Sequence, residues 1–198
     1  MTRFCYLIPL ALGPLRLMSG AAAPVPDHLR AGGPPLYFPT SVGAEWVYQG
    51  GDDEHTERVV AVEEKEGTFV VSYGQVEKDG GVPWVNKVSV SADGLADLGY
   101  TRGEKKVTYA TPDVMLKLPF KADQVWDGPI GVGDTRKSVA SERVKVPAGT
   151  FEAIKVDYEL KADNLVLSAW YAPGVGRVKA SSHRGRELVL KSFTREKK

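Results

Sequence analysis

The chain has 198 residues, 42% of them hydrophobic, and its 26 basic side chains nearly balance its 25 acidic ones. This composition is typical of a globular protein and excludes a disordered or collagen-like chain. The near-neutral charge gives no sign of nucleic-acid binding. The single cysteine, Cys5, excludes an internal disulfide and a zinc-thiolate site.

The first 23 residues have the three-part order of a secretory signal peptide. Arg3 precedes an apolar run over residues 4–15, and small residues follow, ending in Ala21-Ala22-Ala23. The apolar run is too short for a membrane-spanning helix, which needs about 20 residues. We therefore expect cleavage after Ala22 or Ala23 and a periplasmic or extracellular protein. Because Cys5 lies at the start of the apolar run and not after it, we expect no lipid anchor.

After the leader, residues 24–35 form a Pro- and Gly-rich linker with almost no apolar side chains. Over residues 154–160 the even positions are apolar and the odd ones charged, which predicts a strand with one buried face. Similar runs recur with turn residues between them, and no stretch has a helical period. The pattern predicts one all-β domain over residues 36–198, with about ten or eleven antiparallel strands in a curled open barrel or a sandwich.

The chain also contains a candidate internal repeat with an offset near 80 residues, over 36–112 and 116–195. Trp46 follows Pro39 by seven residues, and Trp126 follows Pro119 by the same spacing. One hypothesis is two similar meanders that share a core, with Trp46 and Trp126 in equivalent places. The alternative is that turn residues of β-meanders recur by coincidence.

No motif for catalysis or cofactor binding is present in the sequence. The three histidines, His28, His55 and His183, have no partner that the sequence supplies, and neither a G-x-S-x-G serine motif nor a phosphate-binding glycine loop occurs. The acidic run 52–54 beside His55 is too short to hold a metal alone, and we interpret it as a solvated hairpin tip. We therefore expect no enzyme, no cofactor and no metal.

Aromatic side chains recur in the strand-like segments, and two roles are open for them. They can simply fill the core. Along the inner face of a curled sheet they can also line a cavity of a few hundred Å³ for an apolar small molecule or a lipoprotein acyl chain. The candidate ligand-binding residues are Trp46, Tyr48, Tyr73, Trp126, Trp170 and Tyr171.

Basic side chains gather near the C-terminus, where residues 177–198 hold eight basic and two acidic groups. This charge favours contact with an anionic membrane surface or an acidic partner, for which the candidate residues are Arg177, Lys179, Arg184 and Arg186. The alternative is that these side chains protect an exposed edge strand from pairing with another chain.

Four sequence blocks resemble a widespread family of exported bacterial β-proteins of unknown function. They are YFP (37–39) with VGxxWVY (42–48), LKLPFK (116–121), VPAGTFEAIKV (146–156) and WYAPGVGxVK (170–179). The family usually has Gly-Asp before the second tryptophan, where this chain has Ala122-Asp123. By fold analogy the family is similar to open-barrel periplasmic lipoprotein carriers, which wrap an acyl chain in a curled antiparallel sheet. The resemblance implies such a fold and brings no catalytic residues.

Together these observations predict a monomeric, exported, non-enzymatic protein of the cell envelope that binds or carries an apolar ligand. The alternative is an interaction module that docks on a partner protein through its sheet edge or its basic C-terminal strands. An apolar cleft would favour the first hypothesis, and a fully packed core would favour the second. A hydrolytic enzyme, the third hypothesis, would show clustered titratable groups in a pocket.

Overall fold

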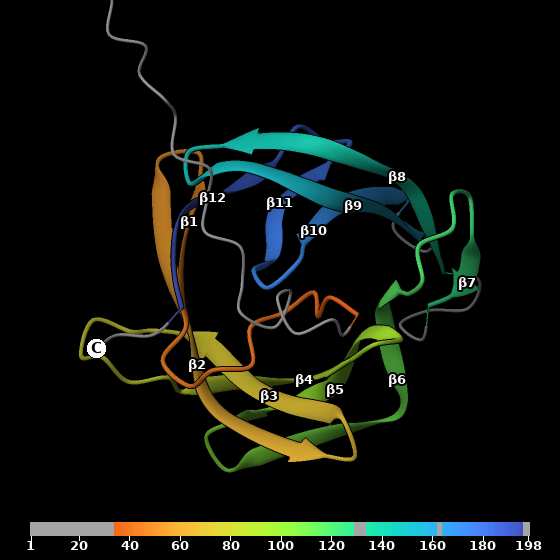
Figure 1. Ribbon diagram of the computed structural model, residues 1–198. Coiled ribbons are helices and arrows are strands. Elements are labelled where there is room, and N and C mark those ends of the chain that lie inside the picture. Colours follow the sequence, from red (N-terminus) through yellow and green to blue (C-terminus); the bar gives the residue numbers. More distant parts are fainter. Residues whose placement is uncertain (1–33, 129–133, 162–163, 196–198) are drawn as a thin grey trace, which may run out of the picture.

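The computed structural model describes residues 34–128, 134–161 and 164–195. These residues form β-strands and turns, and they include no helix that could span a membrane. Figure 1 shows the strands in chain order. They are β1 (Glu45–Gly50), β2 (Asp53–Lys65), β3 (Thr68–Gln75), β4 (Trp84–Ser91), β5 (Gly94–Arg102), β6 (Lys105–Lys117), β7 (Val125–Asp127), β8 (Thr135–Val146), β9 (Gly149–Leu160), β10 (Leu165–Ala172), β11 (Gly176–Ser182) and β12 (Glu187–Thr194).

All of these strands belong to one 12-stranded antiparallel sheet. Its order is β6-β5-β4-β3-β2-β1-β12-β11-β10-β9-β8-β7, so each half of the chain forms a meander of consecutive strands. The two meanders join where β1 pairs with β12. The predicted curled all-β fold is confirmed, and the structure adds the short strand β7, which the period-two pattern does not reveal.

The strands are amphipathic, as their sequence pattern predicts. In β9 the side chains of Ile154 and Val156 are buried, whereas Glu159 on the opposite face is exposed. This alternation buries one face of each strand inside the curl, and the inward side chains form a single core cluster.

The boundary between the two meanders lies close to the boundary of the candidate repeats. Trp46 and Trp126 are both buried, each on the first strand of its meander. Their indole nitrogens have different partners, because Trp46 donates to the carbonyl of Val175 and Trp126 to that of Val114 in β6. The equivalence of the two tryptophans stays a prediction.

The sheet curls without closing, because β6 and β7 are its two edges and share no backbone ladder in the described part of the chain. Side chains bridge this seam instead. The hydroxyl of Tyr158 donates to the carbonyl of Met115 at 3.1 Å, and Arg136 of β8 pairs with Asp113 of β6 at 2.9 Å. With the bond from Trp126 to β6, these contacts join the meanders on the side where the backbone does not.

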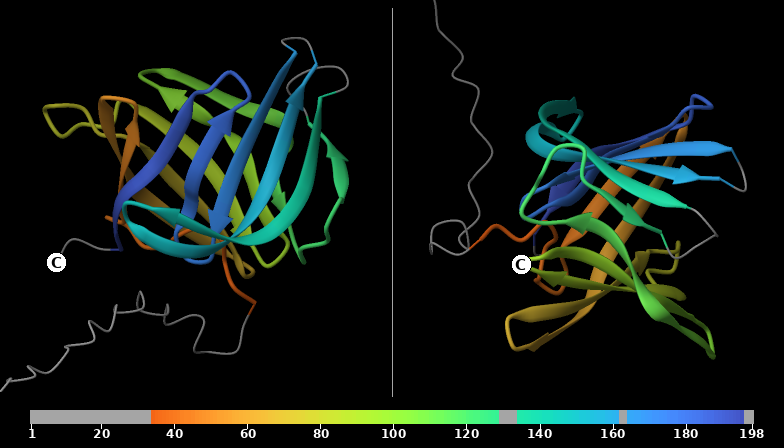
Figure 2. Two further views of the ribbon diagram at one scale, coloured as in Figure 1. Left: turned by 90° about the horizontal axis from the view of Figure 1, so that it is seen from above. Right: turned by 90° about the vertical axis from the view of Figure 1, so that its right-hand side faces the viewer.

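One end of the curled sheet is filled by the segment before β1, residues 34–44 (Figure 1; Figure 2). Strand number sets the width of a curled sheet, and about 8 strands already enclose a space that their own side chains just fill. This wider sheet therefore needs added volume, which Phe38 supplies by packing 5.2 Å from both Trp46 and Tyr73, measured between ring centroids. Gly176 leaves room for the ring, since a Cβ there would lie 3.1 Å from Phe38 Cδ2.

Two predicted segments fall partly or wholly outside the described residues. The signal peptide over 1–23 and residues 24–33 of the linker lie outside the described residues. Pro34 and Pro35, at the end of the predicted linker, precede the first strand and lie in no regular structure. The boundaries of the leader and the linker stay predictions.

Replacement of Phe38 by Ala should lower the free energy of unfolding by about 3–5 kcal/mol, because a cavity replaces a buried ring. Urea unfolding followed by tryptophan fluorescence measures the change. The matched control is Val42→Ala in the same segment, at a residue that is 53% exposed. This control should change stability by less than about 0.5 kcal/mol. A loss below about 1 kcal/mol for Phe38→Ala would show that the segment is not part of the core.

Candidate functional site

A cleft of about 1140 Å³ is lined by residues of both meanders, at the end of the curled sheet away from Phe38. Its rim is formed by the turn between β1 and β2, the turn between β11 and β12, and the facing ends of β9 and β10. The segment with Phe38 instead contacts the other end of these strands, where Gly174 donates to the carbonyl of Leu36. Small-molecule sites in proteins typically occupy about 300–1,000 Å³, so this cleft can hold a ligand of lipid size.

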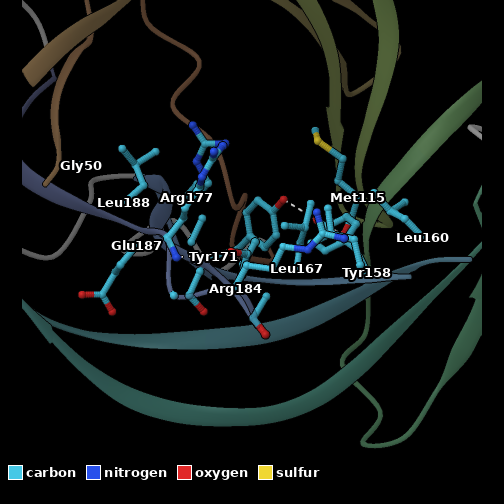
Figure 3. Close-up of a pocket in the computed structure, with 18 of the residues that line it drawn as sticks. Gly50, Met115, Tyr158, Leu160, Leu167, Tyr171, Arg177, Arg184, Glu187 and Leu188 are labelled. Atoms are coloured by element: carbon cyan, nitrogen blue, oxygen red, sulfur yellow. Dashed lines mark hydrogen bonds between the residues drawn. The ribbon is translucent and has the colours of Figure 1, made fainter. Parts of the chain in front are cut away.

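The wall of the cleft is largely apolar. On β10, Leu167 and Ala169 point into the cleft, whereas their neighbour Val166 is 40% exposed. Figure 3 shows Met115 entering the same space from the opposite meander, on β6. The aliphatic side chains of the wall are Met115, Leu160, Leu165, Leu167 and Leu188.

A β-bulge turns Arg177 into this cleft. On β10 and β11, Trp170 pairs with Lys179 and Tyr171 pairs with Arg177, so Val178 is the extra residue. Directly paired residues share a face of the sheet. Arg177 therefore lies with Tyr171 on the inner face, and Lys179 lies with Trp170 on the outer face.

The guanidinium of Arg177 is held by loose contacts. Its Cζ lies 5.2 Å from the ring centroid of Tyr48, and its Nη2 lies 3.5 Å from Glu57 Oε1. The Nε atom is buried without a hydrogen-bond partner among the described residues, while 36% of the side chain stays exposed. Burial alone would lower the pKa of Arg177, but Tyr48 and Glu57 raise it above its usual value. The side chain is therefore a full cation.

Two tyrosines and an ion pair form the floor of the cleft beside Arg177. The hydroxyls of Tyr158 and Tyr171 are 2.5 Å apart (Figure 3). Arg136 lies with its Cζ 4.6 Å from the ring centroid of Tyr158, and its Nη2 contacts both carboxylate oxygens of Asp113 at 2.9 Å. Arg136 is 1% exposed, and Asp113 pairs with its charge, while its Nε and Nη1 have no hydrogen-bond partner among the described residues.

The inner tyrosines are neutral hydrogen-bonding groups. Burial raises the pKa of Tyr48, Tyr73, Tyr158 and Tyr171 above the usual value for a phenol. The hydroxyl of Tyr48 donates to the carbonyl of Arg177 at 2.7 Å. The cleft therefore combines an aliphatic wall, neutral hydroxyls and a partly exposed cation, an arrangement suited to binding a molecule with an apolar and a polar end.

The structure separates the six candidate aromatic residues. Tyr171 lines the cleft. Trp46, Tyr48 and Tyr73 belong to the core cluster or pack against it, and Trp46 is 1% exposed. Trp126 lines a second pocket of about 370 Å³ at the seam between β6 and β7.

Trp170, the sixth candidate, lies outside the curl. The ammonium groups of Lys155 and Lys179 lie 5.4 and 5.2 Å from its ring centroid. Its indole nitrogen donates to Glu142 at 2.5 Å. Trp170 thus organises charged side chains on the outer face of β8 to β11.

The four candidate basic residues are also divided between the two faces. Arg177, Arg184 and Arg186 line the cleft. Lys179 pairs with Glu187 at 2.6 Å. The basic strands thus place most of these charges around the cleft instead of on one outer surface.

The histidines and the acidic run serve local contacts. His55 stacks on Tyr48 with the ring centroids 5.5 Å apart, and Nδ1 of His183 accepts a hydrogen bond from the amide of Val166. His28 lies outside the described residues. Residues 52–54 run from the turn after β1 into the start of β2, and Glu54 pairs with Lys191. Within the described ranges no three His, Cys, Asp or Glu side chains gather as a metal site.

Several residues of the cleft were not predicted from the sequence. The alternation of Leu165, Leu167 and Ala169 carries a readable signal, since all three share the inner face of β10. Arg136 carries none, because the segment around it is polar at nearly every position. Its inward position depends on the partner Asp113 in the other meander, a contact between distant parts of the chain.

Comparison with known proteins gives a family and two structural neighbours. Residues 54–192 match the model of a family described as DUF3108-like, and no curated protein matches the sequence. A Bacteroides fragilis structure described as an exported protein with a YmcC-like fold has 15% identity and a TM-score of 0.53, covering 81% of this chain and 99% of that one. A Parabacteroides distasonis structure described as a lipoprotein has 18% identity, a TM-score of 0.51 and the same coverage. At these identities the likeness shows the fold alone.

Removal of one partner from the buried Arg136–Asp113 pair should lower the free energy of unfolding by about 3–5 kcal/mol, because an uncompensated charge stays buried. The double variant Arg136→Met with Asp113→Leu should recover most of the loss that Asp113→Leu causes alone. Urea unfolding of both single variants and the double variant measures this coupling. The control, Lys137→Met, breaks an exposed pair with Asp123 and should leave the free energy of unfolding nearly unchanged. Additive losses would contradict the proposed coupling across the seam.

Proposed function

The chain belongs to the DUF3108-like family, and we propose that it is an exported, non-enzymatic protein that binds an apolar ligand, such as an acyl chain, in the cleft between its meanders. The cleft is the observation that carries this proposal. Its volume of about 1140 Å³ and its aliphatic wall fit a long apolar molecule.

The energetic basis of binding is the transfer of methylene groups from water to the aliphatic wall. Each buried CH₂ group contributes about 0.8 kcal/mol, so a chain of moderate length gains several times that amount. Met115 suits such a site, because its flexible and polarisable side chain adapts to ligands of different shape. The binding free energy at this wall should therefore depend more on the length of the ligand's apolar chain than on its detailed structure.

The rest of the fold can support a cleft of this size without losing its core. Phe38, Trp46 and Tyr73 pack together at the opposite end of the curled sheet. The Arg136–Asp113 pair joins the two meanders at the floor of the cleft. A ligand can thus enter at the rim while the packed end stays intact. Binding to the folded state would also stabilise it by mass action.

Export is part of the proposal and has two kinds of support. Residues 1–23 have the pattern of a leader that is removed after Ala22 or Ala23. The two structural neighbours are described as an exported protein and a lipoprotein. In the aqueous envelope, an unaccompanied acyl chain exposes apolar surface to water, and the cleft would remove it.

Contact with an anionic membrane is proposed as the step at which the ligand is exchanged. Arg184 and Arg186 lie at the mouth of the cleft, in the turn between β11 and β12. Anionic headgroups attract basic side chains near the membrane surface. Docking through the outer face of the basic strands has less support, since Arg177 lies in the cleft and Lys179 pairs with Glu187.

Leu167→Glu should weaken binding of the neutral fluorescent probe N-phenylnaphthylamine about tenfold or more, because a charge is placed against the apolar ligand. Titration of the purified protein with the probe measures the affinity. Val166→Glu is the matched control on the same strand, with the new carboxylate on the outer face, and its affinity should stay within about twofold of the original. Equal affinity of the two variants for the probe would contradict the proposed site. The absence of saturable binding in all three proteins would contradict it as well.

A further inference from the structure

We propose that the ligand of this cleft is an anionic amphiphile, whose carboxylate or phosphate group binds Arg177 while its acyl chain lies on the aliphatic wall. This inference rests on the proposed function and names the chemical class of the ligand. The shared chemistry is a compact group of anionic oxygens attached to an apolar chain.

The first support is that the pairing of Arg177 within the protein is incomplete. Charge-assisted hydrogen bonds between nitrogen and oxygen are about 2.7–2.9 Å long. Arg58 meets Glu45 at 2.7 Å, whereas Arg177 approaches Glu57 only to 3.5 Å. A guanidinium has five N–H donors, so the contacts with Glu57 and Tyr48 leave part of its capacity for a ligand.

The second support is that Glu57 is shared with another side chain. Its Oε1 lies 3.5 Å from His55 Nε2 and 3.5 Å from Arg177 Nη2. Neither distance is that of a short ion pair. Glu57 therefore offsets the charge of Arg177 without occupying its donors, and an incoming anion can supply the missing hydrogen bonds.

The third support is the burial of Arg177 at the boundary between polar and apolar parts of the cleft. Figure 3 shows its guanidinium near Leu188 and Tyr171, with Met115 across the same space. Burial of a charge beside apolar side chains is unfavourable unless a partner is present. The buried, unpartnered Nε marks this cost, which a ligand anion would offset.

The charges around the cleft favour an anion over a cation. Four arginines line it, against the acidic residues Asp53, Asp113 and Glu187. Two of these acids are neutralised within the protein, because Asp113 pairs with Arg136 and Glu187 pairs with Lys179. Because the lining holds more basic than acidic side chains, it favours anionic ligands over cationic ones.

The β-bulge that turns the Arg177 side chain to the inner face also supports a role of Arg177 in ligand binding. β-Bulges are common beside functional sites, where they redirect a side chain. In a regular strand Arg177 and Lys179, two positions apart, would lie on the same face of β11. The bulge places one cation inside the cleft and leaves the other outside, which provides a matched pair of residues for the test.

The experiment measures the affinity of four probes that share a twelve-carbon chain, each below its micelle-forming concentration. Dodecanoate and dodecyl phosphate are anionic, monolauroylglycerol is neutral, and dodecyltrimethylammonium is cationic. Each is titrated by isothermal calorimetry into the original protein, Arg177→Gln and Lys179→Gln. The original protein should prefer the anionic probes to the neutral one by about tenfold or more, the effect of a hydrogen bond to a charged group. Arg177→Gln should remove this preference, and Lys179→Gln should retain it.

Circular dichroism checks whether Arg177→Gln folds, and Arg177→Lys serves as a milder variant. If Arg177→Gln does not fold, the four probes on the original protein still test the proposal. Equal affinity for anionic and neutral probes, or an unchanged preference in folded Arg177→Gln, would overturn the anionic ligand and leave the apolar site standing. Binding of no probe by the original protein would overturn both proposals. The tighter of the two anionic probes identifies carboxylate or phosphate as the headgroup. Failure of inorganic phosphate to compete would show that the chain is also required, as the proposal expects.

Discussion

The width of the curled sheet is the constraint on which the rest of the structure depends. A 12-stranded curl encloses more space than its own inward side chains fill. The protein resolves this differently at its two ends, because Phe38 from the preceding segment packs one end with Trp46 and Tyr73, while the other end stays open as a cleft. Within the described residues the edge strands β6 and β7 share no backbone ladder, and side-chain contacts across the seam join them instead.

The cleft acquires its chemistry from a few departures from regular β-structure. A bulge places Arg177 beside an aliphatic wall, and the Arg136–Asp113 pair keeps a second guanidinium matched in the floor. The two arginines differ in their carboxylate contacts, since Arg136 joins the meanders through a short ion pair and Arg177 approaches Glu57 only to 3.5 Å. The inner tyrosines stay neutral through burial and add hydroxyl groups without adding charge. Such a site suits a molecule with one anionic end and one apolar end.

Period-two alternation made the strands and the all-β class predictable, as in β9, where buried and exposed residues alternate as expected. It could not predict β7, which has only 3 residues. It also could not place Arg177 and Lys179 on opposite faces, because a bulge changes the period locally and leaves no mark in the sequence. The candidate aromatic residues show the same limit, since Trp170 lies outside the curl and Tyr171 lines the cleft although they are neighbours. Pairing across the seam depends on residues far apart in the chain.

Met115 offers the most direct test that an acyl chain occupies the cleft. From residue 24 onward the chain contains this one methionine, and its side chain lines the cleft. Isotopic labelling of the methionine methyl group in protein that begins at residue 24 therefore places a single nuclear magnetic resonance reporter at the site. Titration with stearate carrying a nitroxide near its chain end should broaden this resonance in a saturable manner, and unlabelled stearate should reverse the effect. A resonance that stays unchanged while calorimetry records binding of the same stearate would place the ligand elsewhere and contradict the account.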